Sequence, residues 1–198
     1  FDDRRIERVQ ARVRRIDVVA QRLKLEGAAT LPYDTLLIAT GSKPNKFGWP
    51  GQDLARVQGL YDLQDLAALE AITPEIRKAV IVGGGLIGIE LGEMLQSRGI
   101  AVTFLAREAS YWDNVLPDEE SAMVNETVRL HHAGLRLSTE LAFIEGDASG
   151  RVSAVVTKGG ERTECQFVGL TAGVSPNLSA TRAGVSSSSG TRARSTAR

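Results

Sequence analysis

The chain has 198 residues, of which 42% are hydrophobic and 24% are charged, as in an ordinary globular protein. Its 24 basic residues balance 24 acidic residues, so there is no overall field that would attract nucleic acid or an anionic membrane. The longest apolar stretch, Ala79 to Ile89, is too short to span a bilayer. The sequence therefore predicts no nucleic-acid partner and no membrane span.

The cysteine and histidine content argues against a metal or dithiol site. The single cysteine, Cys165, cannot form an internal disulfide, and no Cys/His cluster is present. Cys165 lies in a predicted strand, and we interpret it as a small core residue. His131 and His132 are neighbours on a predicted helix, where adjacent side chains point about 100° apart and cannot chelate one ion together. We predict no metal site, and the free cysteine fits a cytoplasmic location.

The N-terminal region is predicted to form short strands followed by a helix. Strands are expected at Val13–Val19, Arg22–Leu25 and Thr35–Ile38, where β-branched and apolar residues alternate with turn-forming Gly and Pro. A helix is expected from Leu60 to Ile72, where leucines recur every third residue. Thr73-Pro74 ends this helix and marks the expected domain boundary.

An alternating pattern of strands and helices follows. The C-terminal tail then changes to Ser, Thr, Arg, Ala and Gly, and it cannot bury enough apolar surface to offset its ordering entropy. We expect residues 178–198 to be disordered or incomplete. The alternating strands and helices before this tail predict an α/β fold, a Rossmann-type domain with a β-meander. Its expected elements are strand Lys78–Val82, helix Leu86–Arg98 ended by Gly99, strand Ala101–Leu105, helix Pro117–Ala133, meander strands Glu140–Glu145, Val152–Thr157 and Glu161–Gln166, and strand Phe167–Ala172.

A glycine-rich turn connects the first strand of this domain to its helix. The turn reads Gly83-Gly84-Gly85-Leu86-Ile87-Gly88, which is the dinucleotide-binding pattern in the structural context that it requires. Gly83 is expected to permit the tight turn, Gly85 to let the backbone approach a pyrophosphate, and Gly88 to allow close packing of helix on strand. The pyrophosphate would bind the free N–H groups at the start of the helix. The alternative, a turn that is rich in glycine for packing alone, explains fewer of these features.

The end of the second strand bears on the choice of coenzyme. Ala106 stands where an acid usually holds the ribose 2′-hydroxyl of NAD, and Arg107 follows it directly. An Arg–phosphate contact favours NADP over NAD. Glu108 follows and could take the role of the acid, while Arg107 could be merely solvated, so NAD stays open.

Three motifs in order resemble those of the FAD- and NAD(P)-dependent pyridine nucleotide–disulfide oxidoreductase superfamily. The segment Tyr33 to Ser42 is similar to its "YDxLxxATGS" motif, Lys78 to Glu90 to its "GGGxIGxE" turn, and Phe167 to Asn177 to its "GxxPN" crossover. The resemblance implies that residues 1–72 are a partial FAD-binding domain and that 73–177 are an inserted NAD(P)-binding domain. It also implies that Ala39, Thr40 and Gly41 approach FAD, and that Glu90 and Gly173 lie near the nicotinamide.

Other family features are missing from the chain. The first glycine-rich turn, the closing "GD" segment and the redox-active cysteine pair are absent, and Phe1 stands where an initiator Met is expected. We therefore interpret the chain as part of a longer protein, which would hold FAD in its complete form and could form a homodimer through the missing C-terminal part. Glu90 could equally be a helix-surface carboxylate.

The resemblance implies hydride transfer from NAD(P)H to FAD and then to a small-molecule or protein electron acceptor. Since the cofactors supply the redox chemistry, no residue is expected to act as a catalytic acid or base. The alternative is a non-catalytic nucleotide-binding or redox-sensing module. A flavin-free dehydrogenase would need a substrate domain after Asn177, and the tail offers none.

Overall fold

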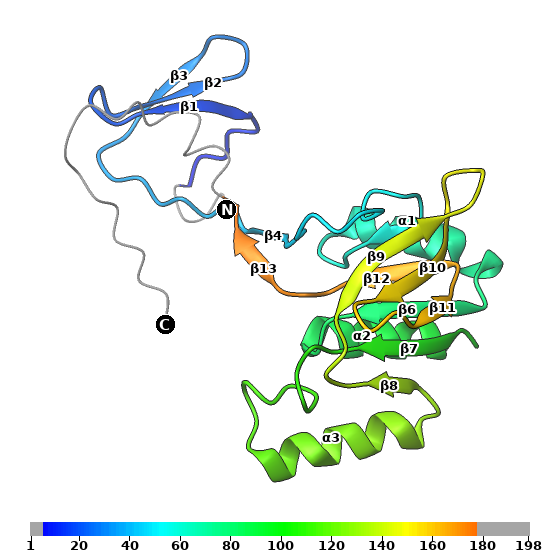
Figure 1. The fold of residues 1–198 in the computed structure, drawn as a ribbon. Helices are drawn as coiled ribbons and strands as arrows, with labels where there is room; N and C mark the ends of the chain where they lie inside the picture. The colour runs from blue at the N-terminus through cyan, green and yellow to red at the C-terminus, as the bar shows by residue number, and fades with distance from the viewer. Residues whose placement is uncertain (1–5, 178–198) are drawn as a thin grey trace. The chain divides into compact units, whose positions relative to one another are not determined.

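The computed structural model describes residues 6–177 (Figure 1). The predicted tail, 178–198, lies outside these residues. The described chain forms two compact units. One contains residues 6–42 with 176–177, and the other is Lys43–Ser175.

The first unit is a small antiparallel sheet. Its strands, in the order β1-β2-β3, are Val13–Asp17, Arg22–Leu25 and Thr30–Pro32. The first two confirm predicted strands. The third predicted strand, Thr35–Ile38, is not formed, and Leu37 is 87% exposed. No strand among the described residues pairs with this segment, and apolar composition without a neighbouring strand does not stabilise an extended ladder.

The second unit is built on a five-stranded parallel sheet in the order β5-β12-β6-β7-β8. The strands β6 (Lys78–Val82), β7 (Ala101–Leu105) and β12 (Phe167–Leu170) confirm the predicted ones. Two short edge strands, β5 (Val57–Gln58) and β8 (Gly134–Arg136), are additional to the prediction. They are too short to carry a periodic signal in the sequence.

Three helices accompany this sheet. They are α1 (Leu63–Ile72), followed by the 3₁₀ turn η2 (Thr73–Glu75), then α2 (Leu86–Gln96) and α3 (Asp118–Leu130). Gly99 has φ +74° after α2, and Ile100 N donates to Leu95 O at 3.1 Å, which confirms the predicted left-handed helix end. The β-meander is also confirmed, as β9 (Leu141–Gly146), β10 (Val152–Thr157) and β11 (Arg162–Glu164).

The parallel sheet is buried on both faces, which explains why its strands are continuously apolar. Along β6, Ala79 and Ile81 pack into the cluster that includes α1, α2 and α3 residues, while Val80 and Val82 pack into the cluster that includes the meander. The second unit is therefore a three-layer sandwich of helices, sheet and meander (Figure 1). Cys165 belongs to the meander-side cluster and is 1% exposed, so its prediction as a core residue is confirmed. Burial raises the pKa of its thiol to about 12.

The boundary between the two units differs from the one predicted. The sequence places it at residue 72, but the segment from Lys43 to Ile72 packs with the nucleotide-binding unit. The physical reason is that β5 pairs with β12, and that Leu69 of α1 is 2% exposed in the helix-side core. A further pair of strands, β4 (Ser42–Pro44) and β13 (Val174–Pro176), forms a two-stranded sheet where the chain enters and leaves this unit.

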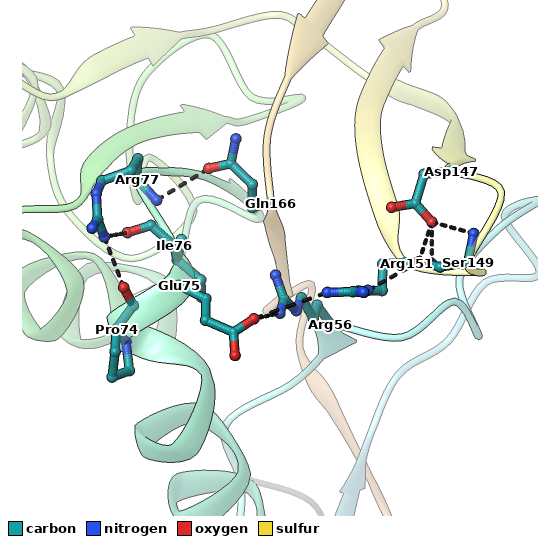
Figure 2. A network of polar contacts seen from close by, with 9 residues as sticks. All are labelled: Arg56, Pro74, Glu75, Ile76, Arg77, Asp147, Ser149, Arg151 and Gln166. Atoms are coloured by element: carbon teal, nitrogen blue, oxygen red, sulfur yellow. Dashed lines mark hydrogen bonds and ion pairs between the residues drawn. The ribbon is translucent and has the colours of Figure 1, made fainter.

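The amino end of the parallel sheet carries a polar network, which we call the amino-end network (Figure 2). Gln166 Oε1 accepts the backbone N–H groups of Arg77 at 3.1 Å and Lys78 at 2.9 Å, and so joins the starts of β12 and β6. Glu75 forms an ion pair with Arg56, and Arg151 Nη1 lies 3.9 Å from the same carboxylate oxygen. The network thus links η2, the start of the sheet and the start of β10. Its members are Arg56, Glu75, Arg77, Lys78, Arg151 and Gln166.

Candidate nucleotide-binding site

The carboxyl end of the parallel sheet gathers the predicted nucleotide-binding residues. Gly83 follows β6, Ala106 follows β7, and Thr171 follows β12. From β6 the chain runs to β7 and β8 on one side, and it returns with β12 on the other. Ligands of open α/β sheets bind in the crevice at such a reversal of strand order. The glycine turn is therefore located where this fold places ligands.

Gly83 makes the sharp exit from β6. Its φ is +132°, a region that side chains rarely adopt, and its N–H donates to Leu105 O at 2.9 Å. A Cβ built on Gly83 would lie 2.6 Å from Thr171 O. Both the conformation and the space exclude any other residue, so the expected role of Gly83 in the tight turn is confirmed.

Gly85 stands at the N-cap of α2 and has a different character. Its backbone is extended, with φ −117° and ψ 180°, which any residue can adopt. A Cβ built on it would meet no atom within 4 Å. No side chain caps this helix end, and the first N–H groups of α2 have no intrahelical acceptor. Nothing inside the described chain requires glycine at this position.

Gly88 lies one turn into α2, where the helix approaches the end of the sheet. A Cβ at this position would lie 2.8 Å from Tyr111 Oη and 3.0 Å from Thr171 Oγ1. The expected close packing at Gly88 is confirmed, and its nearest neighbour is a tyrosine hydroxyl. Tyr111 is fully buried.

The residues after β7 bring an acid and a base close to the turn. Ala106 is fully buried, whereas the Arg107 side chain is 78% exposed. Arg107 Nε donates to Glu108 Oε1 at 2.8 Å, and this bond raises the pKa of Arg107 further. A Cβ at Gly84 would lie 3.3 Å from Glu108 Oε2. Glu108 thus lies against the turn and Arg107 extends outward, so both coenzymes keep a candidate partner.

The predicted flavin-side and nicotinamide-side residues lie elsewhere on the chain. Thr40 Oγ1 donates to Asn177 O at 2.6 Å, and Asn177 N donates to Gly41 O at 2.9 Å. In the first unit, these bonds join the ends of the "YDxLxxATGS" and "GxxPN" motifs. Ala39 is exposed beside them. In the second unit, Gly173 has φ +88° and its carbonyl accepts from Asn45 N at 3.0 Å.

Glu90 lies exposed on α2, four residues after Leu86 at the start of that helix. Its expected place near the nicotinamide stays a prediction.

Three residues at the site were not among the predicted binding residues. Thr171 follows the strand next to β6, and its hydroxyl donates to Val82 O at 3.2 Å. Glu108 was predicted only as an alternative to Arg107, and Tyr111 was not assigned to the site. The signal that could have identified Thr171 is its position after β12, but sequence order alone does not show that β12 neighbours β6.

The described residues provide little for other site classes. Within 6–177, no group of His, Cys, Asp and Glu side chains is arranged to hold a metal ion. No helix in this part of the chain combines the length and the apolar character that a membrane span requires.

Comparisons with known proteins agree with the predicted family. The family model for pyridine nucleotide-disulphide oxidoreductases matches residues 3–193. The assimilatory nitrate reductase electron transfer subunit of Bacillus subtilis is 30% identical over 82% of this chain and 21% of its own length. The ferredoxin–NAD(+) reductase component of the biphenyl dioxygenase system of Paraburkholderia xenovorans is 31% identical over 83% of this chain and 40% of its own length. The chain thus spans less than half of each of these relatives.

Solved structures give the same result. A ferredoxin reductase from Rhodopseudomonas palustris superposes with a TM-score of 0.86 over 92% of this chain and 45% of its own, at 24% identity. A FAD-dependent pyridine nucleotide-disulphide oxidoreductase from Desulfovibrio vulgaris superposes with a TM-score of 0.74 over 89% of this chain and 46% of its own, at 29% identity. The fold class predicted from the sequence is confirmed. With a family model that matches nearly the whole chain, this protein belongs to the pyridine nucleotide-disulphide oxidoreductase family.

Proposed function

We propose that this chain is the nicotinamide-nucleotide-binding part of a flavoprotein that transfers hydride from NAD(P)H to FAD and passes the electrons on to an acceptor. Unit Lys43–Ser175 would bind the nicotinamide nucleotide, and the first unit would contribute to the FAD site. The names of the relatives support this activity, because one is an electron transfer subunit and another is a ferredoxin–NAD(+) reductase component.

The observation that carries the proposal is the contrast between Gly85 and its neighbours. Gly83 and Gly88 are glycine because protein atoms leave no room for a side chain. Gly85 has room for one and an ordinary backbone conformation, so neither packing nor strain accounts for it. A ligand that must approach the backbone at this point accounts for it directly. The residue types therefore fit a dinucleotide pyrophosphate at the start of α2.

The chain's own groups would bind and orient the coenzyme. The N–H groups of Leu86 and Ile87 would donate to the pyrophosphate, and the positive end of the helix dipole would favour its charge. Arg107 or Glu108 would select between the 2′-phosphate of NADP and the 2′-hydroxyl of NAD. The bound cofactors supply the hydride chemistry, and the protein positions them.

The acceptor and the FAD contacts extend the proposal beyond the described site. Ala39, Thr40 and Gly41 would approach FAD, and Glu90 and Gly173 would lie on the nicotinamide side. Since the Paraburkholderia relative is named as a reductase acting with ferredoxin, a protein acceptor of electrons is the acceptor we propose. A cytoplasmic location is proposed with it, supported by the free thiol of Cys165.

The test is the variant Gly85→Val in the full chain. The extended backbone accepts valine, but valine is a poorer N-cap residue than glycine, so the variant should fold with a melting temperature lowered by no more than about 5 °C. Its side chain would occupy the space proposed for the pyrophosphate, so calorimetric titration should show NADH and NADPH binding weakened by at least about tenfold, which corresponds to about 1.4 kcal/mol.

The matched control is Gly159→Val, in the meander. A Cβ at Gly159 meets only Thr157 Oγ1 at 3.7 Å, and its φ is outside the left-handed region. This variant should bind both coenzymes like the wild type. If neither coenzyme binds the wild-type chain, or if Gly85→Val binds both normally, the proposed site is wrong.

A further inference from the structure

A single tyrosine hydroxyl lies directly beneath the glycine turn. Tyr111 is 0% exposed, and its Oη donates to Gly85 O at 3.0 Å, with Gly83 O at 3.5 Å. It fills the space that the missing Cβ of Gly88 leaves, since a Cβ at Gly88 would lie 2.8 Å from it. The inner side of the turn is therefore lined by the Tyr111 hydroxyl, which comes from the loop after β7, and by Thr171, which follows β12.

Two buried polar side chains of α3 hold the backbone of this tyrosine. Asn125 Oδ1 accepts from Tyr111 N at 2.9 Å, and Ser121 Oγ donates to Tyr111 O at 2.7 Å. Ser121 is fully buried and Asn125 is 8% exposed. Ser110 Oγ joins them, at 2.6 Å from Ser121 Oγ and 2.6 Å from Asn125 Nδ2. The polar groups of these residues are thus bonded to one another and to Tyr111.

The ring of Tyr111 is fixed as well. It packs edge-on against Phe104 of β7, with ring centroids 5.7 Å apart and an interplanar angle of 86°. Burial raises the pKa of Tyr111 above its usual value, so its hydroxyl stays protonated and remains a donor at neutral pH. Backbone, ring and hydroxyl are therefore each held in one position.

The Tyr111 hydroxyl is one of three donors that orient Gly85 O, and with it the N–H group that follows. In a trans peptide the carbonyl and the following N–H lie on opposite sides of the bond. Gly85 O also accepts from Gly88 N at 3.1 Å and Ile89 N at 3.3 Å. Leu86 N–H lies on the opposite side of this peptide from Gly85 O and its three bonds, at the uncapped start of α2.

We propose that Tyr111 is a positioning residue of the glycine turn, whose buried hydroxyl fixes the Gly85–Leu86 peptide for dinucleotide binding, and that α3 sets Tyr111 through Ser121 and Asn125. The inference rests on the proposed function, and it adds a residue from outside the glycine motif. It also gives the polar face of α3 a role in coenzyme affinity, although α3 itself contributes no atom to the turn.

The first test is Tyr111→Phe in the full chain, titrated calorimetrically with NADH and with NADPH. The ring and its contact with Phe104 remain, so only the hydroxyl is removed. Both affinities should fall by the same factor, about fivefold, as expected for one lost hydrogen bond. Amide hydrogen exchange at Gly88 and Ile89, which donate to Gly85 O, should accelerate while exchange at β6 stays unchanged, which a general loss of stability would not produce.

The matched control is Tyr33→Phe, which removes a hydroxyl bonded to Asp17 O at 3.4 Å in the other unit and should leave both affinities unchanged. The second test is Ser121→Ala, which should weaken binding of both coenzymes about twofold by loosening Tyr111. Because this residue would act through Tyr111, the double variant should bind no more weakly than Tyr111→Phe alone.

The outcomes separate this inference from the proposed function. If the wild-type chain binds neither coenzyme, the proposed function fails and this inference fails with it. If the wild type binds and Tyr111→Phe binds equally well, only this inference is overturned. Additive losses in the double variant would remove the role of α3. Should Tyr111→Phe fail to fold, Ser121→Ala decides, because normal affinity in that variant also overturns the link to α3.

Discussion

The two ends of the parallel sheet in the second unit are built in opposite ways. At the amino end, charged and amide side chains pair with one another and with the backbone, as in the contacts of Glu75 and Gln166 (Figure 2). At the carboxyl end, the turn after β6 has no side chain that caps α2, and its inner side is held by one tyrosine hydroxyl.

This difference indicates which end of the parallel sheet has polar groups available for a ligand. The amino-end network uses its polar groups internally, so it contributes to stability and has little left for a ligand. At the carboxyl end, the same backbone chemistry is left with N–H donors directed away from the protein. Substitutions at the amino end should therefore change the free energy of unfolding alone, and those at the carboxyl end should divide into folding and binding effects.

The largest effect on stability is expected from Gly83→Ala. It would show that a glycine at the carboxyl end is also required for folding. Its φ of +132° and the 2.6 Å approach of a Cβ to Thr171 O combine strain with a backbone clash. We expect the free energy of unfolding to fall by about 3 kcal/mol or more, measured by urea denaturation. An unchanged midpoint would mean that the turn has another conformation, and the contrast with Gly85→Val would be lost.

A smaller and selective effect is expected from Arg107→Ala. If Arg107 binds the 2′-phosphate, NADPH affinity should fall about tenfold, which is about 1.4 kcal/mol, while NADH affinity stays the same. Arg77→Ala, which removes the same charge from the amino end, should alter neither affinity. Calorimetric titration with both coenzymes checks this, and equal losses for NADH and NADPH would remove the case for a phosphate contact.

The smallest effect is expected from Glu75→Gln, in the amino-end network. Glu75 pairs with Arg56, whose side chain is 13% exposed, but its own side chain is 62% exposed. Such a pair contributes about 0.5–1 kcal/mol, so the urea midpoint should decrease slightly with coenzyme affinity unchanged. Glu126→Gln, at an exposed position of α3, serves as the control and should change neither the urea midpoint nor the coenzyme affinity. A loss of coenzyme affinity in Glu75→Gln would contradict the separation of the two ends.

Much of the second unit could be predicted from the sequence, because its signals are local. Four apolar residues after Lys78, a glycine turn and a helix followed by Gly99 each have a physical cause within a few neighbours. The short strands β5 and β8 could not be predicted, since only pairing with longer strands stabilises them. The boundary at residue 72 was misplaced for the same reason: the pairing of β5 with β12 joins residues more than a hundred positions apart.

The site was predictable to the extent that it is a backbone motif. The roles of Gly83 and Gly88 follow from the spacing and were confirmed by their surroundings. Tyr111 and Thr171 could not be assigned to the turn, because they reach it from the ends of other strands and only the sheet order brings them together. The sequence also does not decide whether Arg107 selects NADP or Glu108 selects NAD. The two residues are neighbours, and in the structure their side chains bond to each other.

The pairing of β4 with β13 has a consequence for the history of the chain. Asn45 N donates to Gly173 O at 3.0 Å, so the second unit starts and finishes at neighbouring points. A module whose entry and exit are adjacent can be accepted into a loop of a host protein with little extra loop-closure entropy. Its internal packing can then change separately from that of the host.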